Sequence, residues 1–209
     1  DNRRVAEQAG VIVLGVKPQM FGDVLPGLGG VTAGRCVVSI AAGVSTAYLR
    51  EMLPGAHVVR AMPNTPLMVG VGATAVAEAP DVPPALFQTV LKLFSAAGEV
   101  AVIPEGQMDD IINGSSPAWF FRMAEVMVQR AVSVGIDAGT ALRLTAKTME
   151  GCAKLLQESG KTPGELRRQV CSPGGTTLAS LSAFDEMNYE GLMLEAMRRC
   201  TQRSRELGR

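Results

Sequence analysis

A short run rich in glycine and hydroxyl side chains has the residue types that hold a small carboxylate. It reads S-P-G-G-T-T from Ser172 to Thr177 and precedes an apolar helical stretch. The proline stiffens the turn, the paired glycines let a ligand approach bare backbone, and the free N–H groups of a first helical turn carry partial positive charge. The hydroxyls of Ser172, Thr176 and Thr177 can donate to a ligand oxygen. The alternative is a glycine turn whose hydroxyls only cap the helix.

Three other motifs each follow an apolar run that is typical of a buried strand. They are V-K-P at residues 16–18, S-I-A-A-G at residues 39–43 and M-P-N-T-P at residues 62–66. Open α/β sheets bind ligands at the carboxyl ends of their strands, so these loops are candidate ligand contacts. Lys17 lies between a predicted strand and Pro18, which favours a binding role over that of a solvent-exposed lysine.

The composition excludes several classes of function. The chain has 209 residues, 47% of them hydrophobic and 4% aromatic, with 23 glycines, which fits an α/β protein better than a β-sandwich. Twenty basic residues balance twenty acidic ones, so charge gives no reason to expect a nucleic acid or an anionic membrane as partner. No apolar run approaches the length of a transmembrane helix.

Cysteine and histidine usage argues against a metal centre and a disulfide framework. The four cysteines are widely spaced and form no C-x-x-C pair: Cys36, Cys152, Cys171 and Cys200. This pattern predicts a reduced, cytoplasmic protein. The single histidine, His57, is predicted to begin a strand, and an imidazole cluster that binds a metal is excluded.

The chain alternates strands and helices in its first half and is helical in its second. Strands are predicted over residues 11–16, 36–41, 58–62, 73–77 and 99–103, with helices over 18–28, 45–53 and 84–97. Five helices follow, over residues 119–134, 139–156, 163–170, 176–187 and 190–207. The pattern predicts a Rossmann-like parallel sheet domain over residues 1–104 and an all-helical domain over residues 105–209. The family resemblance given below implies that the Rossmann-like domain is truncated.

The motifs together resemble pyrroline-5-carboxylate reductases, the last enzymes of proline biosynthesis, over nearly the whole chain. G-S-S-P-A-W at residues 114–119 is similar to the family's S-G-S-G-P-A-Y segment, and R-S-R-E-L at residues 203–207 to its closing R-S-x-E-L. Ser116 stands where the family usually has glycine and Trp119 where it usually has tyrosine. The sequence leaves the effect of these two departures open.

The resemblance implies hydride transfer from NADPH or NADH to the C=N carbon of 1-pyrroline-5-carboxylate, which gives L-proline. A cyclic imine is basic enough to bind in its protonated, iminium form. The site must therefore chiefly hold the carboxylate, orient the ring and hydrogen-bond the ring nitrogen. We assign the carboxylate to Ser172, Gly174, Gly175 and Thr176. Thr177 is assigned to the ring nitrogen as a hydrogen-bond donor, because a threonine hydroxyl is a poor free acid.

The resemblance also implies cofactor contacts and a partner. The cofactor residues are Asn2, Gly15, Val16, Lys17, Pro18, Ile40, Ala41 and Ala42, with Asn64 as a weaker candidate and Gln169 and Val170 from the helical domain. Ser115 lines the substrate pocket or caps the following helix, and capping is favoured. Stripes of leucine and methionine on the helices predict subunit contacts. Resemblance points to an interlocked dimer that can form a larger ring.

The family opens with a strand, a G-x-G-x-x-[GA] turn and a helix, whereas this chain begins at Asp1 past that unit. G-V-G-A-T-A at residues 70–75 has the spacing but precedes a predicted strand, so it is not interpreted as this fingerprint. We expect the chain to be a fragment of a complete reductase rather than a short form that binds cofactor poorly. The choice between NADPH and NADH stays open, because the loop that meets the adenosine ribose lies mostly in the missing part.

Two other functions remain open from the sequence. A β-hydroxyacid dehydrogenase joins a dinucleotide fold to a helical domain and uses a helical lysine as its acid–base residue, for which Lys147 and Lys154 are the candidates. S-P-G-G-T-T supplies only hydrogen-bond donors, which argues against that chemistry. The third possibility is a non-catalytic helical oligomerisation protein that has lost its cofactor half.

Overall fold

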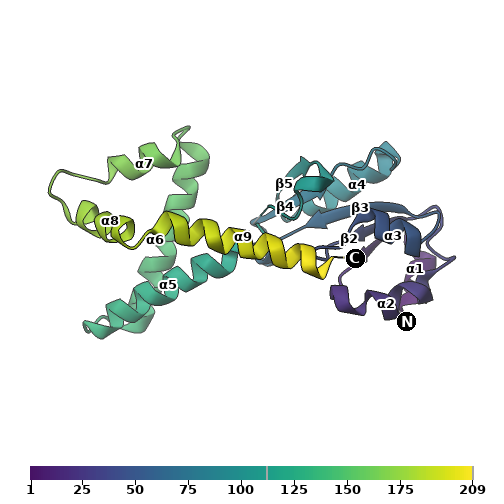
Figure 1. Cartoon of the computed structure of the whole chain (residues 1–209), viewed down its shortest axis with the longest axis horizontal. Helices are drawn as coiled ribbons and strands as arrows, with labels where there is room; N and C mark the ends of the chain where they lie inside the picture. Colours follow the sequence, from purple (N-terminus) through teal and green to yellow (C-terminus); the bar gives the residue numbers. More distant parts are fainter. Residues whose placement is uncertain (112, 209) are drawn as a thin grey trace. The chain divides into compact units, whose positions relative to one another are not determined.

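The computed structural model describes residues 1–111 and 113–208, and the chain divides into two compact units (Figure 1). The first contains Asp1–Pro117 and the chain from Met197 onward, and the second contains Ala118–Ala196. Both changes of unit fall inside helices, namely α5 (Ser116–Ser133) and α9 (Tyr189–Leu207). Ile112 and Arg209, which belong to the predicted helical domain, lie outside the described residues.

The first unit is built on a five-stranded sheet in the order β1-β2-β3-β4-β5. The strands are β1 (Val11–Leu14), β2 (Cys36–Ser39), β3 (His57–Met62), β4 (Gly72–Ala77) and β5 (Gly98–Ile103). The α-helices are α1 (Asn2–Gln8), α2 (Phe21–Val24), α3 (Thr46–Met52) and α4 (Pro84–Ser95). Short 3-10 helices are η1 (Pro18–Met20), η2 (Leu25–Leu28), η3 (Thr65–Val69) and η4 (Glu105–Gln107).

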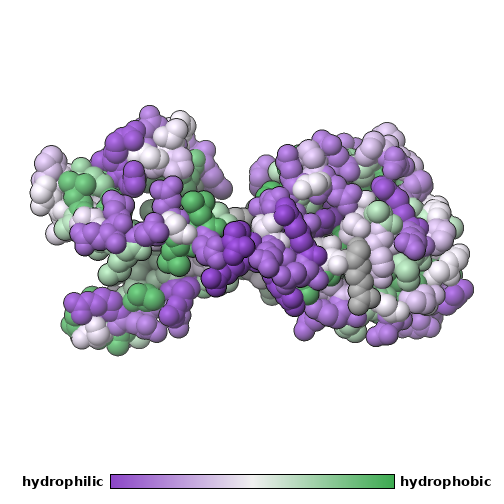
Figure 2. All heavy atoms as spheres, in the orientation of Figure 1, coloured by the Kyte–Doolittle hydropathy of each residue, from purple (hydrophilic) through white to green (hydrophobic). Residues whose placement is uncertain are grey.

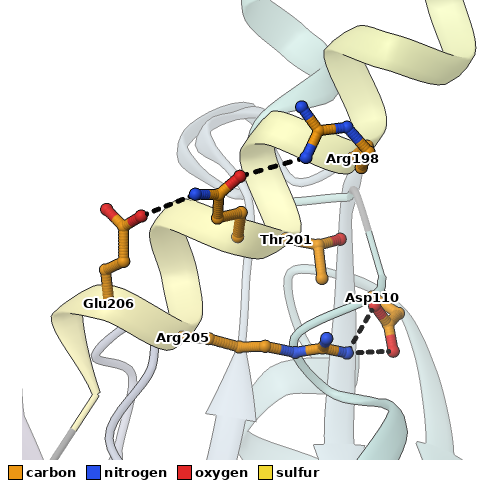
Figure 3. A pocket seen from close by; sticks show the side chains of 6 residues that line it. Asp110, Arg198, Thr201, Arg205 and Glu206 are labelled. Carbon is orange, nitrogen blue, oxygen red and sulfur yellow. Dashed lines mark hydrogen bonds and ion pairs between the residues drawn. The ribbon is translucent and has the colours of Figure 1, made fainter.

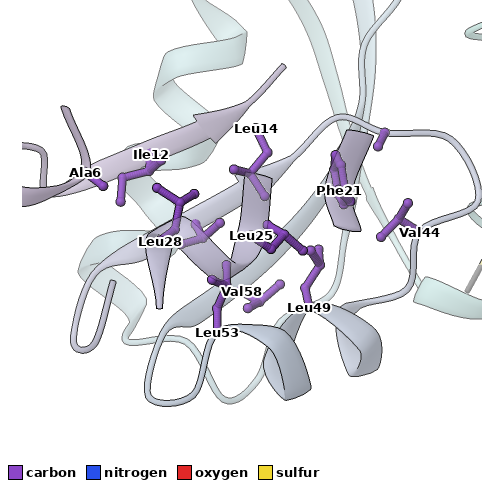
Figure 4. Packing of buried hydrophobic residues seen from close by; sticks show 12 residues of the cluster. Ala6, Ile12, Leu14, Phe21, Leu25, Leu28, Val44, Leu49, Leu53 and Val58 are labelled. Atoms are coloured by element: carbon purple, nitrogen blue, oxygen red, sulfur yellow. The ribbon is translucent and has the colours of Figure 1, made fainter. Parts of the chain in front are cut away.

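The strands β2 and β3 are buried on both faces of the sheet, which gives the unit three layers. Alternate residues of β2 and β3 point to opposite sides. Val37 and Val58 join a cluster with residues of α1, α2 and α3, whose side chains converge in Figure 4. Val38 and Val59 join a second cluster with residues of α4. All five predicted strands are confirmed, and His57 begins β3 as predicted.

The sheet departs from the predicted parallel arrangement at one place. β1, β2 and β3 are parallel to one another, and β4 is parallel to β5, but β3 and β4 are antiparallel. Residues 63–71 connect them, and this is shorter than the roughly dozen residues that a parallel crossover needs. Gly70 ends η3 at φ 77° and Gly72 begins β4, so the interpretation that residues 70–75 are not a dinucleotide fingerprint is confirmed.

In the first unit, the structure corrects one predicted helix and confirms another. The segment 18–28 is not one helix but η1, α2 and η2 in succession, because Gly22, Pro26 and Gly27 weaken a continuous α-helix. The helix predicted over residues 45–53 is confirmed as α3. Its predicted cap is present, since the Ser45 hydroxyl oxygen accepts the Tyr48 N–H at 3.2 Å.

The second unit contains α6 (Ala138–Glu158), α7 (Pro163–Gln169), α8 (Thr176–Glu186) and parts of α5 and α9. These helices leave many large apolar side chains exposed, including Phe121 at 64%, Leu144 at 63% and Leu192 at 64%. Figure 2 shows hydrophobic residues at the surface among the helices of this unit. In the part of the chain that the structure describes, no helix is both long and apolar enough to cross a membrane.

A buried ion pair joins the sheet of the first unit to the segment after β5. Arg60, in β3, is 2% exposed, and its guanidinium donates to the Asp109 carboxylate at 2.6 Å. Burial alone would raise the pKa of Asp109. The hydrogen bonds from Arg60 and Ser204 and the charges of Arg60 and Arg205 outweigh it, so the pKa of Asp109 lies below its ordinary value. The carboxylate is thus held ionised by the folded chain.

The Asp109→Asn variant is expected to lower the free energy of unfolding at pH 7 by about 3 to 5 kcal/mol, because it leaves the buried Arg60 charge without its counter-charge. Because the folded-state pKa is lowered, this contribution is present above the unfolded pKa of about 3.9 and is lost as pH falls through the folded value. Urea denaturation of both proteins from pH 7 to pH 3 measures the difference, which is expected to shrink below about pH 4.

Asp110→Asn is the matched control, because Asp110 is 54% exposed in its pair with Arg205. That variant is expected to change the free energy of unfolding by less than about 1 kcal/mol. Equal losses from the two variants would contradict the assignment of the stabilising pair to Asp109.

Candidate active site

The loops predicted to contact a cofactor leave the sheet at one edge. β1, β2 and β3 run parallel, with Leu14 paired to Ser39 and Ser39 to Arg60 across the strands. Residues 15–18, residues 40–42 and Asn64 follow these strands, so the structure brings them to the same edge. This edge is where an open α/β sheet binds its ligand.

Asn2 lies close to the loop after β1. It lines a small depression of about 90 Å³ together with Gly15 and Val16. A Cβ added at Gly15 would meet no other atom within 4 Å, so the backbone there is open to a ligand. Open backbone, the Asn2 amide and the exposed ammonium of Lys17 are groups that bind the oxygens of a dinucleotide, so these residues fit such a cofactor.

Asn64 has a structural hydrogen bond that the sequence did not indicate. Its side-chain oxygen accepts the Ala73 N–H at 2.9 Å. Asn113 donates from its amide nitrogen to the Met62 carbonyl at 2.7 Å and to the Ala73 carbonyl at 2.9 Å. The two asparagines therefore fix the turn after β3 where it meets the start of β4. Asn113 was missed because its partners are backbone groups far away in the sequence.

Ser115 faces a cavity, although capping was the favoured interpretation. The Cys200 thiol lies 3.1 Å from the Ser115 hydroxyl oxygen. Ser115 lines a cavity of about 350 Å³ with Ala42, Met62 and Pro63, among others. This position supports the pocket role, and the capping role of Ser115 stays a prediction.

The S-P-G-G-T-T turn is in the second unit and has a specific backbone geometry. Gly175 N–H donates to the Ser172 carbonyl at 2.9 Å, and Gly174 has a φ of 69°, which favours glycine. A Cβ at Gly175 would collide with the Ser172 hydroxyl and lie 3.0 Å from the Ser172 carbonyl oxygen. Both glycines are therefore required, one by its backbone conformation and the other by the Ser172 side chain.

The start of α8 has no side-chain cap. Gly175 is the N-cap residue, and the first hydrogen bond into the helix runs from Ala179 N–H to the Gly175 carbonyl. The N–H groups of Thr176, Thr177 and Leu178 consequently have no acceptor among the described residues. The hydroxyls around the turn do not cap α8, so the alternative interpretation of the motif is wrong. A helix start left open in this way binds an anion.

Gln169 and Val170 stand at the other side of the turn, where α7 ends. The Thr162 hydroxyl and the Glu165 carboxylate cap the start of α7 reciprocally. The Cys171 thiol donates to the Arg167 carbonyl at 3.1 Å at its end. The second unit contains Gln169, Val170 and residues 172–177, and the first unit contains the other predicted site residues.

The two lysines considered as acid–base residues are bound to a carboxylate. Lys147 and Lys154 lie 2.8 Å and 2.9 Å from Glu150 on the exposed face of α6. Hydrogen bonds from both lysines, with their charges, lower the pKa of Glu150 to about 2. The hydrogen bond to Glu150 and its charge raise the pKa of Lys154, which makes that lysine a poorer base near neutral pH.

The closing R-S-R-E-L motif forms contacts within the first unit, and Arg203, Ser204 and Leu207 line the cavity that Ser115 also lines. Ser204 donates to Asp109 at 2.8 Å, and Arg205 binds both oxygens of Asp110 at 3.1 Å. Figure 3 shows the Arg205 pair beside the exposed face of α9. Within residues 1–111 and 113–208 there is no group of three or more side chains suited to hold a metal ion.

Comparison with known proteins identifies one family. A family model described as pyrroline-5-carboxylate reductase dimerisation matches residues 105–207. The chain is 37% identical to the pyrroline-5-carboxylate reductase of Synechocystis sp., over 100% of this chain and 79% of that protein. It is 36% identical to the Escherichia coli enzyme, over 99% of this chain and 78% of that protein.

Solved structures agree with the sequence relatives. The pyrroline carboxylate reductase of Plasmodium falciparum, with NADP bound, matches with a TM-score of 0.94 and 25% identity over 100% of this chain and 81% of that one. The pyrroline-5-carboxylate reductase of Coxiella burnetii matches with a TM-score of 0.88 and 32% identity over 100% of this chain and 80% of that one.

The Gly175→Ala variant is expected to weaken binding of a small carboxylate about tenfold or more, the loss expected for a charge-assisted hydrogen bond. The backbone of Gly175, at φ −79°, suits alanine, so the effect comes from displacement of the Ser172 hydroxyl. Calorimetric titration with L-proline measures it. Gly151→Ala, where a Cβ meets nothing within 4 Å, is the control. Equal affinities of the two variants would refute the role of the turn.

Proposed function

The chain belongs to the pyrroline-5-carboxylate reductase family, and from this premise we propose how its residues carry out the NAD(P)H-dependent reduction of 1-pyrroline-5-carboxylate to L-proline. The reaction adds a hydride to the C=N carbon and leaves a proton on the ring nitrogen. The protein must therefore hold the carboxylate, orient the ring and stabilise the nitrogen. No acid–base pair is required for these tasks.

Residues 1–104 are assigned to cofactor binding and residues 105–209 to substrate binding and dimerisation. The cofactor contacts proposed in the first unit are Asn2, Gly15, Val16, Lys17, Pro18, Ile40, Ala41, Ala42 and Asn64. Gln169 and Val170 are proposed contacts from the second unit. The reduced nicotinamide, when bound, supplies the hydride. The oxygen of Asn64 is occupied by Ala73 N–H, so its amide nitrogen is the group left for a ligand.

The substrate carboxylate is assigned to the turn before α8. The uncapped N–H groups of Thr176 and its neighbours are the observation that carries this assignment. They supply oriented donors and the positive end of the helix dipole, which together bind a carboxylate. Ser172 adds a hydroxyl, and Gly174 and Gly175 keep side chains away from the bound anion.

Thr177 is assigned to the ring nitrogen. Its side chain is half-buried at the start of α8. A hydroxyl there donates a hydrogen bond as the nitrogen lone pair develops during hydride addition, and it relays a proton from water. A donor aimed at a developing charge contributes more in the transition state than in the bound substrate.

The alternative function, that of a β-hydroxyacid dehydrogenase, has less support. That reaction needs a base for the carbinol proton. Lys147 and Lys154 are both bound to Glu150, and the pKa of Lys154 is raised. A lysine base for catalysis near neutral pH requires the opposite shift, toward a lower pKa.

We propose that this chain self-associates as an interlocked dimer, which can assemble into a larger ring. Support comes from the distribution of exposed apolar residues over several helices, which include Phe121 on α5, Leu144 on α6 and Leu192 on α9. A flat docking surface would expose apolar residues on one side only. Apolar residues on several helices favour two copies that wrap around each other.

A cytoplasmic location is also part of the proposal. All four cysteines are free thiols: Cys36, Cys152, Cys171 and Cys200. Burial raises the pKa of the Cys36 thiol, which makes that cysteine unreactive. Free thiols at this number are typical of proteins in a reducing compartment.

Thr177→Val, which keeps the shape and removes the hydroxyl, is expected to lower kcat by about ten- to a thousandfold in the full-length enzyme. Ser172→Ala is expected to act mainly on KM for pyrroline-5-carboxylate, because a carboxylate contact is made equally before and during the reaction. Steady-state kinetics with NADPH separate the two. Thr148→Val, on α6, is the control for removing a threonine hydroxyl. An unchanged kcat in Thr177→Val, with circular dichroism intact, would reduce Thr177 to a structural residue.

An interlocked dimer is expected to lose helical structure and dissociate in one step, because the separated helical unit cannot bury its apolar faces. Light scattering and circular dichroism across a urea titration are therefore expected to give coincident transitions. The Leu144→Asp variant is expected to shift the midpoints of both transitions to a lower urea concentration. The Leu93→Glu variant, with its change on α4 of the first unit, is expected to leave both midpoints unchanged. A folded monomer at low micromolar concentration would contradict interlocking.

A further inference from the structure

The last residues of α9 pack against the loop after β2. Gly43 lies in that loop at φ 77°, a conformation that favours glycine. A Cβ added there would collide with the Ser204 carbonyl oxygen and lie 2.8 Å from Gly208 N. A Cβ at Gly208 would likewise collide with the Gly43 carbonyl oxygen. Backbone meets backbone at this contact, and no side chain fits between the two segments.

The helix end is anchored to the sheet. The Ser204 hydroxyl donates to Asp109 at 2.8 Å, and the same carboxylate oxygen accepts from Arg60 at 2.6 Å. Arg60 is buried in β3, so Asp109 cannot move without exposing or unpairing that charge. Arg205 adds a second, more exposed attachment to Asp110. The position of Ser204 is therefore set by the core of the first unit.

The loop itself is tethered on both sides of Gly43. The Ser39 hydroxyl oxygen accepts the Ala41 N–H at 3.3 Å. Beyond the loop, the Glu105 carboxylate accepts the Thr46 N–H at 2.7 Å and the Thr46 hydroxyl at 2.6 Å. The contact with α9 adds a third support in the middle, at Gly43. The loop is thus supported at Ala41, Gly43 and Thr46, which restricts its motion, as a loop that must present backbone to a ligand requires.

We propose that the end of α9, residues 204–208, is a positioning element for the cofactor loop, and that Ser204 is its positioning residue. This inference rests on the proposed function, in which residues 40–42 contact the cofactor. In this role Ser204 acts through the contact of its backbone with Gly43. A loop braced in its binding conformation costs less ordering on binding and keeps the nicotinamide oriented for hydride transfer.

This role gives the R-S-x-E-L ending a place in catalysis. Ser204 is its serine, and the loop that it supports carries the S-I-A-A-G motif. Among the residues that the structure describes, the neighbouring Arg203 pairs with Glu206 along α9, at 2.9 Å. Ser204 is the residue of the motif whose hydroxyl is anchored to the buried Arg60–Asp109 pair.

The test compares two variants at Ser204 with one at Thr201, in the full-length protein. Ser204→Ala is expected to weaken NADPH binding about two- to tenfold, the range of one net hydrogen bond, with KM for pyrroline-5-carboxylate unchanged. Ser204→Thr keeps the hydroxyl and is expected to restore NADPH affinity. Thr201→Ala removes a hydroxyl on the same helix that hydrogen-bonds to no other described residue, and it is expected to change neither value. Fluorescence titration with NADPH and steady-state kinetics supply the two readouts.

The outcomes separate this proposal from the proposed function. If the Ser204→Ala variant bound NADPH with the same affinity as the Thr201→Ala variant, the positioning role would be overturned, whatever the activity. An equal rise in both the NADPH dissociation constant and KM for pyrroline-5-carboxylate would also overturn it, because it would indicate a general loss of structure. Wild-type protein that binds NADPH but does not reduce pyrroline-5-carboxylate would refute the proposed reaction and leave the comparison of variants valid. Wild-type protein that binds no NADPH would refute both.

Discussion

A buried guanidinium is the constraint on which the first unit depends. Arg60 lies in β3 at 2% exposure, where an unpaired charge would cost on the order of several kcal/mol. Its pairing with Asp109 requires the chain after β5 to return beside the carboxyl end of β3. The same return brings Asn113 to the Met62 carbonyl and Ser115 to the cavity beside Ala42. One electrostatic requirement therefore arranges the surroundings of the candidate cofactor loops.

The second unit is stabilised in a different way. The starts of two of its helices are capped locally, by the Asp137 carboxylate on α6 and by the Thr162 capping box on α7. Its helix faces are not satisfied locally, since Ala141 and Thr145 are the buried residues of α6 while Leu144 and Leu155 are exposed. Local caps specify helices, but they do not bury apolar surface. Self-association therefore supplies the hydrophobic stabilisation of the unit that carries the turn before α8.

Patterns of local origin were predictable from the sequence, and long-range contacts were not. The five strands and the start of α8 follow from apolar runs and from the S-P-G-G-T-T turn, because these signals lie within a few residues of one another. The antiparallel β4 was missed, since only the short connection after Met62 forces the chain to reverse. Asn113 was missed, and Ser204 was noted only as part of the R-S-R-E-L motif, because the partners of both residues lie far away in the chain. No local pattern reveals such contacts.

The chemistry of imine reduction explains why glycines, rather than titratable side chains, mark the candidate site. The hydride donor and the iminium must be oriented toward each other, and the carboxylate of the substrate must be anchored. Backbone N–H groups can anchor a carboxylate without any change in their own protonation state. Such groups are useful only where the backbone is exposed and held still. Gly174 and Gly175 expose it before α8, and Gly43 lets the end of α9 hold the loop after β2. Replacing any of them with a larger residue alters the position of a backbone donor or of its support, and a side chain elsewhere cannot restore that position. In the proposed mechanism, main-chain geometry thus positions the substrate and the cofactor, and the Thr177 hydroxyl assists the ring nitrogen.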